Sequence, residues 1–355
     1  MLLDAETLKQ SAVLDPTIAE LIKTTPIPVL PWDNNDQLKV MAKVMDATVL
    51  SALGTAEPAL QESYFEIAMR DGFQSRAKLI KPTSPPACGS PLIVLMFGGG
   101  FVIGSPDQMT PVGRAFARQF DATVVCVGYR LAPDYKFPTS QTDCFDGLKW
   151  VAANAESLGA DPSKGFVVGG VSAGGNTAAV SVRLAQEDKL AHPITGCWLN
   201  IPSVLAEHCV PEKYKQYWQA SEQNANAPIL DKAGTEAIKK VTQWDENSPL
   251  RYPILFKSPL GEHPPTYFQA CGMDPLRDDA LIYEELLKEA GVKTKIDFYP
   301  GAPHGHSSFF PDLEISKRAK ADTMIGMGWL LGKSVTAEEG LKALAGPNAV
   351  GGLGA

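Results

Sequence analysis

The 355-residue sequence lacks the residue patterns that usually hold metal ions. Its five histidines form no HExxH pair, and its six cysteines form no CxxC pair. Because protein zinc sites are usually built from such closely spaced ligands, we expect no metal and no other cofactor. Cys126, Cys197 and Cys271 lie within or at the ends of apolar runs, so we expect them to be free thiols that pack as small hydrophobic side chains.

The sequence also has no excess of basic residues. It contains 32 Lys and Arg against 40 Asp and Glu, for a net charge of −8, and has no basic patch interleaved with aromatics. A nucleic-acid partner is therefore not expected, because phosphate backbones require a basic surface. The first ten residues are partly acidic and lack a long apolar run, so neither a signal peptide nor a membrane span is expected, and a cytoplasmic location is the default. Whether the chain forms a homodimer is left open.

What the sequence does contain is a GxSxG pattern at residues 170–174, with Ser172 at its centre. An apolar run, GFVVG, precedes it, and a run of small residues follows. This order predicts a strand, a tight turn and a helix. A serine at such a turn has its hydroxyl lifted clear of the sheet, and the glycines let strand and helix pass without a Cβ clash. Ser172 is the candidate nucleophile.

A second glycine-rich segment comes about seventy residues earlier. The apolar run Leu92 to Met96 predicts a buried strand that leads into Gly98, Gly99 and Gly100. An ordinary strand-to-helix turn would need only one glycine. Backbone N–H groups in such a loop can stabilise the oxyanion that forms during acyl transfer. We assign this role to the N–H groups of Gly98 and Gly99, with that of Ala173 as a third donor.

Two polar side chains follow later strands. Asp274 comes after the predicted strand Thr266 to Ala270, and His304 comes after the predicted strand Lys295 to Tyr299. Catalytic groups of open α/β sheets lie at the carboxyl ends of strands. The chain order serine, acid, histidine is that of one fold class, in which the histidine takes the proton from the attacking serine and the acid orients the imidazole.

Each of these two roles has a nearby competitor. Asp278 falls one turn into the helix expected after Asp274, and His306 lies two residues after His304. We prefer Asp274 because it is closer to the strand end. The other histidines, His192, His208 and His263, are interpreted as surface or packing residues.

Several segments together resemble the hormone-sensitive-lipase and arylacetamide-deacetylase branch of the α/β-hydrolases. They are Phe97 to Gly104, Tyr129 to Pro138, Gly169 to Asn176, Gly272 to Asp278 and Tyr299 to His304. The resemblance implies an α/β fold with a mostly parallel eight-stranded sheet, helices on both faces, a helical cap and carboxylesterase activity. It also places the catalytic base at His304 and the catalytic acid at Asp274.

The sequence departs from this family at two positions. Phe97 stands where the family usually has a histidine that holds the glycine loop, and Val171 stands where an acidic residue is common. We expect packing of Phe97 and Phe101 to hold the loop instead. The candidate substrate-binding residues are Phe97, Phe101, Val171, Tyr214 and Trp218. Tyr214, Tyr217 and Trp218 have helical spacing and are expected either to line the substrate site or to dock a helix on the sheet.

The alternation of strands and helices predicts a parallel sheet that opens with a hairpin, Tyr64 to Met69 and Gln74 to Ile80. The remaining strands are expected at 92–96, 123–127, 166–168, 196–201, 266–270 and 295–299. This pattern stops for about sixty residues after Val204, and a long irregular segment of this kind is usually functional. We therefore expect an N-terminal cap segment at 1–55, the hydrolase core at 56–203 and 265–335, a cap insertion at 204–264 and a flexible tail at 336–355.

These features predict a serine carboxylic-ester hydrolase that acts through an acyl-enzyme. The expected partner is a small to medium, apolar ester, and tailoring of a secondary metabolite is one role. One alternative is a lyase, transferase or cyclase that uses the same pocket on a metabolic intermediate. Another is a small-molecule-binding protein that kept the fold and lost catalysis, although the intact serine, acid and histidine set argues against it.

Overall fold

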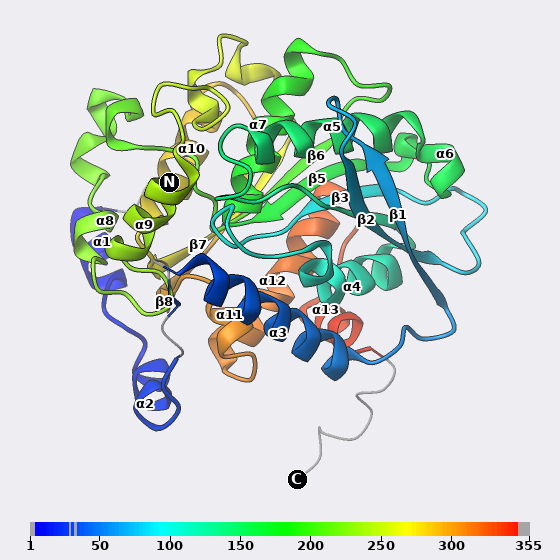
Figure 1. The fold of residues 1–355 in the computed structure, drawn as a ribbon. Helices are drawn as coiled ribbons and strands as arrows, with labels where there is room; N and C mark the ends of the chain where they lie inside the picture. Colours follow the sequence, from blue (N-terminus) through cyan, green and yellow to red (C-terminus); the bar gives the residue numbers. More distant parts are fainter. Residues whose placement is uncertain (1–3, 28–29, 32–33, 347–355) are drawn as a thin grey trace.

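The computed structural model describes residues 4–27, 30–31 and 34–346. Its centre is an eight-stranded sheet with the order β1-β2-β4-β3-β5-β6-β7-β8 (Figure 1). Strands β1 and β2 are antiparallel to each other, β2 is antiparallel to β4, and all other neighbours are parallel. The strands are β1 (Leu60–Ala68), β2 (Gln74–Pro82), β3 (Leu92–Met96), β4 (Thr123–Val127), β5 (Phe166–Val171), β6 (Gly196–Asn200), β7 (Thr266–Met273) and β8 (Thr294–Pro303). The expected mostly parallel, eight-stranded α/β fold is confirmed.

Helices cover both faces of the sheet. Helices α5, α7 and α10 lie on one face, and α4, α12 and α13 lie on the other (Figure 1). The α-helices are α1 (Ala5–Ser11), α2 (Pro16–Thr24), α3 (Asn35–Leu53), α4 (Thr110–Phe120), α5 (Thr139–Ala153), α6 (Ala155–Leu158), α7 (Ala173–Glu187), α8 (Ala220–Gln223), α9 (Lys232–Thr242), α10 (Arg277–Glu289), α11 (His306–Phe309), α12 (Glu314–Leu330) and α13 (Ala337–Ala345). In the described ranges, none of the helices combines the length and the apolar character needed to cross a membrane.

The central strands are apolar along their whole length because both of their faces are covered. Every residue of β3 and β4 is buried. Parallel strands with helices on both sides require such runs, since each side chain faces a helix layer. This is why the sequence locates β3 and β4 to the residue.

Strands β1, β2, β5, β7 and β8 each run further at one end or both than the sequence predicts. Strand β5 was expected to end at Val168, yet it continues through Gly169 and Gly170 to Val171. Glycine is required at these strand positions because neighbouring elements leave no room for a Cβ atom. A Cβ on Gly169 would lie 2.9 Å from the Cβ of Trp198 on β6. Strands β7 and β8 likewise extend to Met273 and Pro303. Asp274 and His304 therefore come directly after the ends of these two strands.

The expectation of a flexible tail from residue 336 is wrong for its first part. Residues 337–345 form helix α13, which packs against α12 and α4. Thr336 caps this helix by accepting from the Glu339 N–H, while the Glu339 side chain accepts from the Thr336 N–H. The Thr336 and Glu339 pair is a capping-box pattern that the sequence contains, but the whole tail was expected to be flexible because its end is rich in glycine. Residues 347–355 lie outside the described residues.

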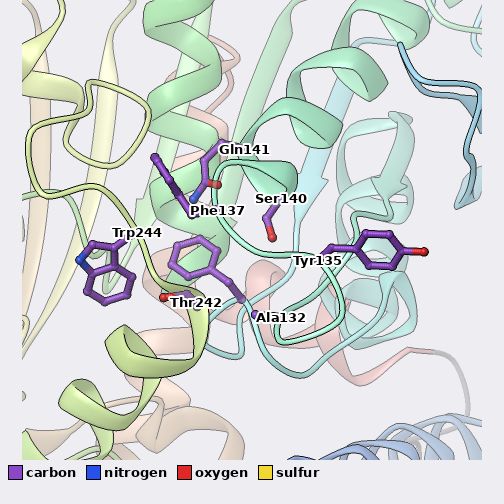
Figure 2. Close-up of a pocket in the computed structure, with 8 residues that line it drawn as sticks. Ala132, Tyr135, Phe137, Ser140, Gln141, Thr242 and Trp244 are labelled. Atoms are coloured by element: carbon purple, nitrogen blue, oxygen red, sulfur yellow. The ribbon is translucent and has the colours of Figure 1, made fainter.

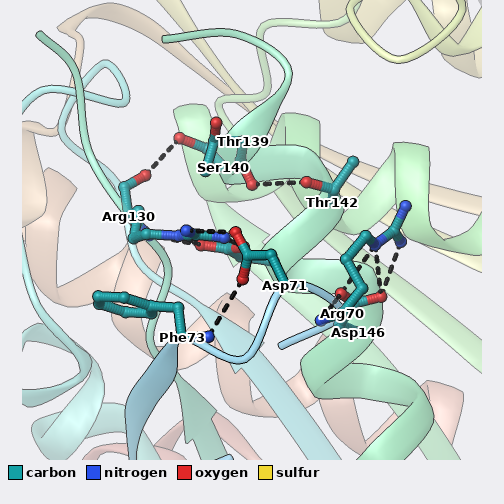
Figure 3. A network of polar contacts seen from close by, with 9 residues as sticks. Arg70, Asp71, Phe73, Arg130, Thr139, Ser140, Thr142 and Asp146 are labelled. Carbon is teal, nitrogen blue, oxygen red and sulfur yellow. Dashed lines mark hydrogen bonds and ion pairs between the residues drawn. The ribbon is translucent and has the colours of Figure 1, made fainter. Parts of the chain in front are cut away.

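A network of ion pairs holds the hairpin turn to helix α5 (Figure 3). The Arg130 guanidinium donates to both carboxylate oxygens of Asp143 on α5 and to Asp71 in the β1–β2 turn. Beside it, Arg70 makes a similar two-pronged contact with Asp146. These contacts tie structural elements together, so we interpret Arg130 and Asp143 as structural residues.

Candidate active site

Ser172 occupies the turn between β5 and α7. Its backbone has φ of 56° and ψ of −116°, a conformation that L-residues rarely adopt. The turn is possible because glycines stand on both sides. A Cβ on Gly170 would lie 2.2 Å from the Gly174 carbonyl oxygen, and one on Gly174 would lie 2.1 Å from the Met96 carbonyl oxygen. The serine is therefore held at the apex, where its side chain is only partly buried.

Ser172, His304 and Asp274 form a continuous hydrogen-bonded chain. The Nε2 atom of His304 lies 2.8 Å from the Ser172 Oγ, and its Nδ1 lies 2.7 Å from the Asp274 Oδ2. Asp274 directly follows β7 and His304 directly follows β8, so the sheet itself fixes their separation. The other oxygen of Asp274 accepts from the Leu276 N–H at 2.8 Å. The Asp274 carboxylate is thus held by the imidazole at one oxygen and by a backbone N–H at the other.

The competing carboxylates have other partners. Asp278 accepts from the Arg277 side chain and from the N–H groups of Gln219 and Ala220, at the start of α8. Asp279 accepts from two further N–H groups, those of Val204 and Leu205, through one oxygen. Sequence reasoning missed this role. Two consecutive carboxylates of α10 anchor the segment between β6 and β7 to the core.

Burial of Asp279 has a consequence for stability. Loss of solvent raises its pKa from the usual 3.8 to about 8, despite its two N–H donors. Between these values the carboxyl is neutral in the folded protein and charged in the unfolded chain. Unfolding then releases a proton, so the free energy of unfolding falls as pH rises from about 4 to about 8.

We expect Asp279→Asn to weaken this dependence. The amide oxygen can accept the same two N–H bonds but does not ionise. Urea unfolding at pH 5 and pH 8 should show a smaller loss of stability for the variant than for the wild type. Equal losses in both proteins would contradict the assignment of the titration to Asp279.

His306 does not take the place of His304. It is buried, and its Nδ1 lies 3.3 Å from the Cys271 Sγ while its ring packs on Tyr299. Burial lowers the pKa of His306 to about 4, so the ring is neutral at ordinary pH. It makes no contact with the Ser172 hydroxyl.

The loop after β3 approaches the serine from the other side. A Cβ on Gly98 would lie 3.5 Å from the Ser172 Cβ and 2.9 Å from the Val171 carbonyl oxygen. Gly99 has φ of 114°, where side chains are strained. In the described ranges, the N–H groups of Gly98 and Gly99 have no acceptor in the protein, and Ala173 is the first residue of α7, whose N–H has no partner within the helix. Three backbone donors thus remain for a ligand.

Phe97 holds this loop by packing and not by a polar side chain. Its ring is buried and stacks on Tyr129, with centroids 4.0 Å apart, and the Tyr129 hydroxyl donates to the Phe97 carbonyl at 2.7 Å. The aromatic pair therefore fixes both the ring and the main chain. Phe97 lies beneath the loop, and Tyr129 supplies the polar tether that the sequence reasoning did not find.

Phe101 lines a small cavity between the core and the end of α9. Figure 2 shows the aromatic side chains of Phe137 and Trp244 around it, with Gln141 approaching from α5. Its volume of about 10 Å³ is that of one water molecule. The guanidinium of Arg251 lies over the rings of Trp244 and Phe101, 4.1 Å and 6.0 Å from their centroids. In this closed arrangement the cavity holds no substrate-sized group.

Val171 lines a larger cavity of about 180 Å³ on the sheet face covered by α4 and α12. Gly305 also lines it. These residues are the immediate neighbours of Ser172 and His304 in the sequence, but none of the three residues of the hydrogen-bonded chain lines the cavity. Trp198 and Leu344 lie in its wall farther along.

Tyr214 and Trp218 lie elsewhere. They belong to a short 3₁₀ helix, η4 (Glu212–Tyr217), and to the residue that ends it, and not to the α-helix that their spacing predicts. The Tyr214 hydroxyl donates to Glu289 on α10, and Trp218 packs partly buried against the core. Neither residue lines either of the two cavities. Tyr214 therefore contacts α10 and not the sheet on which the sequence analysis expected a helix to dock.

Known proteins resemble this chain in sequence and in structure. Residues 93–308 match the family described by its alpha/beta hydrolase fold. The versiconal hemiacetal acetate esterase of Dothistroma septosporum is 35% identical over 262 residues, which cover 74% of this chain and 79% of that protein. Carboxylesterase NlhH of Mycobacterium tuberculosis is 36% identical over 224 residues, which cover 62% and 67%. The crystal structure of vibralactone cyclase superposes with a TM-score of 0.84 at 30% identity, covering 94% of this chain and 98% of that one.

The chain therefore belongs to the α/β-hydrolase family, in its hormone-sensitive-lipase-like branch of carboxylesterases. The resemblance drawn from the sequence motifs is confirmed.

Proposed function

We propose that this carboxylesterase-type enzyme hydrolyses a small to medium carboxylic ester through an acyl-enzyme on Ser172. The single observation that carries the proposal is the hydrogen-bonded chain from Asp274 through His304 to the Ser172 Oγ. Beside this chain lie the N–H groups of Gly98 and Gly99, which donate to no acceptor among the described residues.

In the first step the Ser172 Oγ attacks the ester carbonyl carbon while His304 takes its proton at Nε2. The Asp274 carboxylate holds the Nδ1 proton and stabilises the imidazolium. The carbonyl oxygen becomes an oxyanion, which the N–H groups of Gly98, Gly99 and Ala173 stabilise by several kcal/mol. The C–O bond to the alcohol then breaks, and His304 returns the proton to the leaving oxygen.

In the second step water replaces the alcohol. His304 removes a proton from water as the water attacks the acyl carbon, and the Ser172 Oγ leaves with the proton that His304 returns. The products are an acid, an alcohol and the regenerated enzyme. Every proton is transferred at a single imidazole nitrogen, which lies within hydrogen-bond distance of the serine.

A second candidate reaction is cyclisation. The similarity in fold to vibralactone cyclase favours it. The same acyl-enzyme would be attacked by a hydroxyl or other nucleophile of the bound acyl group instead of by water. The two reactions share the acylation step and differ only in what accepts the acyl group.

Steady-state turnover of p-nitrophenyl esters from acetate to decanoate tests the proposal. We expect saturable release of p-nitrophenol together with one free acid per turnover. A cyclase would release the phenol without the free acid from substrates that carry an internal nucleophile. No release from any ester in the series would contradict the proposed function and would favour a binding role.

A further inference from the structure

The Asp274 carboxylate can orient His304 only if the backbone that carries it is held in place. Asp274 lies in the turn between the end of β7 and the start of α10. The pairing of β7 with β8 is irregular just before this turn, because its register shifts between Cys271 and Met273. In the same stretch β8 contains Pro300, which has no N–H to donate. The regular ladder of the sheet therefore does not fix the backbone of the turn by itself.

The side-chain amide of Asn224 supplies two hydrogen bonds to this turn. Its Nδ2 donates to the Gly272 carbonyl at 3.1 Å and to the Asp274 carbonyl at 2.9 Å. Both contacts are to carbonyl oxygens, so the nitrogen of the amide must face them, and both of its hydrogens are used. The Asp274 carbonyl also accepts from the Arg277 N–H at 3.0 Å. Asn224 thus joins the end of β7 to the first residue of the turn.

The burial of Asn224 shows that these two bonds are its main contribution. The residue is 1% exposed, and its Oδ1 has no hydrogen-bond partner among the described residues. A buried polar atom without a partner lowers stability. A leucine of similar size would avoid that cost but would donate to neither carbonyl. Asn224 lines neither of the two cavities, so its amide acts on the backbone around the catalytic acid.

Helix α8 holds Asn224 at a fixed place relative to the turn. Asn224 directly follows this helix, which ends at Gln223. At the start of the helix Asp278 accepts from two backbone N–H groups, each at 2.6 Å. At its end the Gln223 side chain accepts from the Arg277 guanidinium at 2.9 Å. Because α8 is bonded at both ends to residues that closely follow Asp274, the Asn224 amide cannot simply move with a displaced turn.

We propose that Asn224 is a positioning residue of the reaction, which keeps the Asp274 carboxylate within hydrogen-bond distance of the His304 Nδ1. This inference rests on the proposed function. Asn224 takes no part in proton transfer and acts only through Asp274. It belongs to the segment between β6 and β7, so the docking of that segment is a condition for an oriented imidazole and not only a cover for the sheet.

Asn224→Ala removes both bonds and leaves the turn free to shift. We expect kcat for p-nitrophenyl esters to fall about tenfold to a hundredfold, the scale of a small displacement of a catalytic group. KM should stay within about threefold of the wild-type value, because the lost bonds orient the acid and do not bind the ester. Asn224→Ser keeps one hydroxyl donor and should lose less activity. A kcat of Asn224→Ala equal to that of the wild type would overturn the proposal.

A double-mutant cycle with Asp274 separates positioning from a general loss of structure. In the Asp274→Ala variant there is no carboxylate to orient, so the further change Asn224→Ala should not lower the residual kcat again. A purely structural effect would lower kcat by the same factor in both backgrounds. The proposal is wrong if the two factors are equal, because the effect of Asn224 then does not pass through Asp274.

Each kcat is expressed per folded molecule, from the native circular dichroism signal, because the loss of buried bonds also lowers stability. If Asn224→Ala does not fold, the same cycle with Asn224→Ser decides. Asn154→Ala is the control, since the Asn154 amide donates to the Trp150 carbonyl at the end of α5, and it should have the wild-type kcat. A wild type that hydrolyses no ester contradicts the proposed function. An active wild type with an equally active Asn224→Ala contradicts only this inference.

Discussion

Ser172→Ala is expected to lower kcat for p-nitrophenyl esters by about a thousandfold or more while leaving the fold intact. Without Oγ there is no atom at 2.8 Å from the His304 Nε2 to attack the carbonyl. Residues of such a unit act together, so loss of one removes most of the rate that all of them supply. The residual rate would come from the N–H donors of the glycine loop.

Circular dichroism and thermal unfolding of Ser172→Ala should match the wild type, because the side chain is small and partly exposed. Ser157→Ala is a suitable control, since Ser157 is an exposed serine whose hydroxyl bonds only to the Asn154 carbonyl. It should retain full activity. An active Ser172→Ala variant would move the nucleophile elsewhere.

His304→Ala should reduce kcat to a similar extent, again by about a thousandfold or more. Without the imidazole nothing removes the serine proton, and the Asp274 carboxylate loses the group it orients. The loss should appear at all pH values, since no other base lies within reach of the Ser172 Oγ in the described structure.

The matched comparison is His306→Asn. His306 lies two residues away but contacts the Cys271 thiol, and its neutral ring has no bond to the serine. We expect this variant to stay within about tenfold of the wild type, with any change arising from packing. The opposite result, an active His304→Ala and an inactive His306→Asn, would make His306 the base.

The sequence predicted the fold and the positions of the site's components because those depend on local patterns. Strands β3 and β4 are apolar from end to end, and the glycines around Ser172 report close backbone approach. The carboxyl ends of parallel strands meet at one edge, which brings Asp274 and His304 near Ser172. The order of these residues in the chain and their positions after strands were therefore enough to predict that they lie together.

The remaining features depend on contacts between distant segments. The sequence favours Asp274 over Asp278 as the acid, but the separate role of Asp278, which accepts from the backbone at the start of α8, is a contact that the sequence does not show. The Tyr129 tether on the glycine loop spans 32 residues, and neither residue type predicts it. The lining of the larger cavity likewise combines residues of β5, α4 and α12, which are remote from one another in sequence.

Covalent labelling of the native enzyme tests the central claim most directly. A fluorophosphonate should add once per chain, and peptide mapping by mass spectrometry should place the adduct on the peptide that contains Ser172. The His304→Ala variant and wild-type protein denatured before the reagent is added should not be labelled, because the serine is reactive only in the folded arrangement. An adduct on another residue, or ester hydrolysis that survives complete labelling of Ser172, would contradict the account.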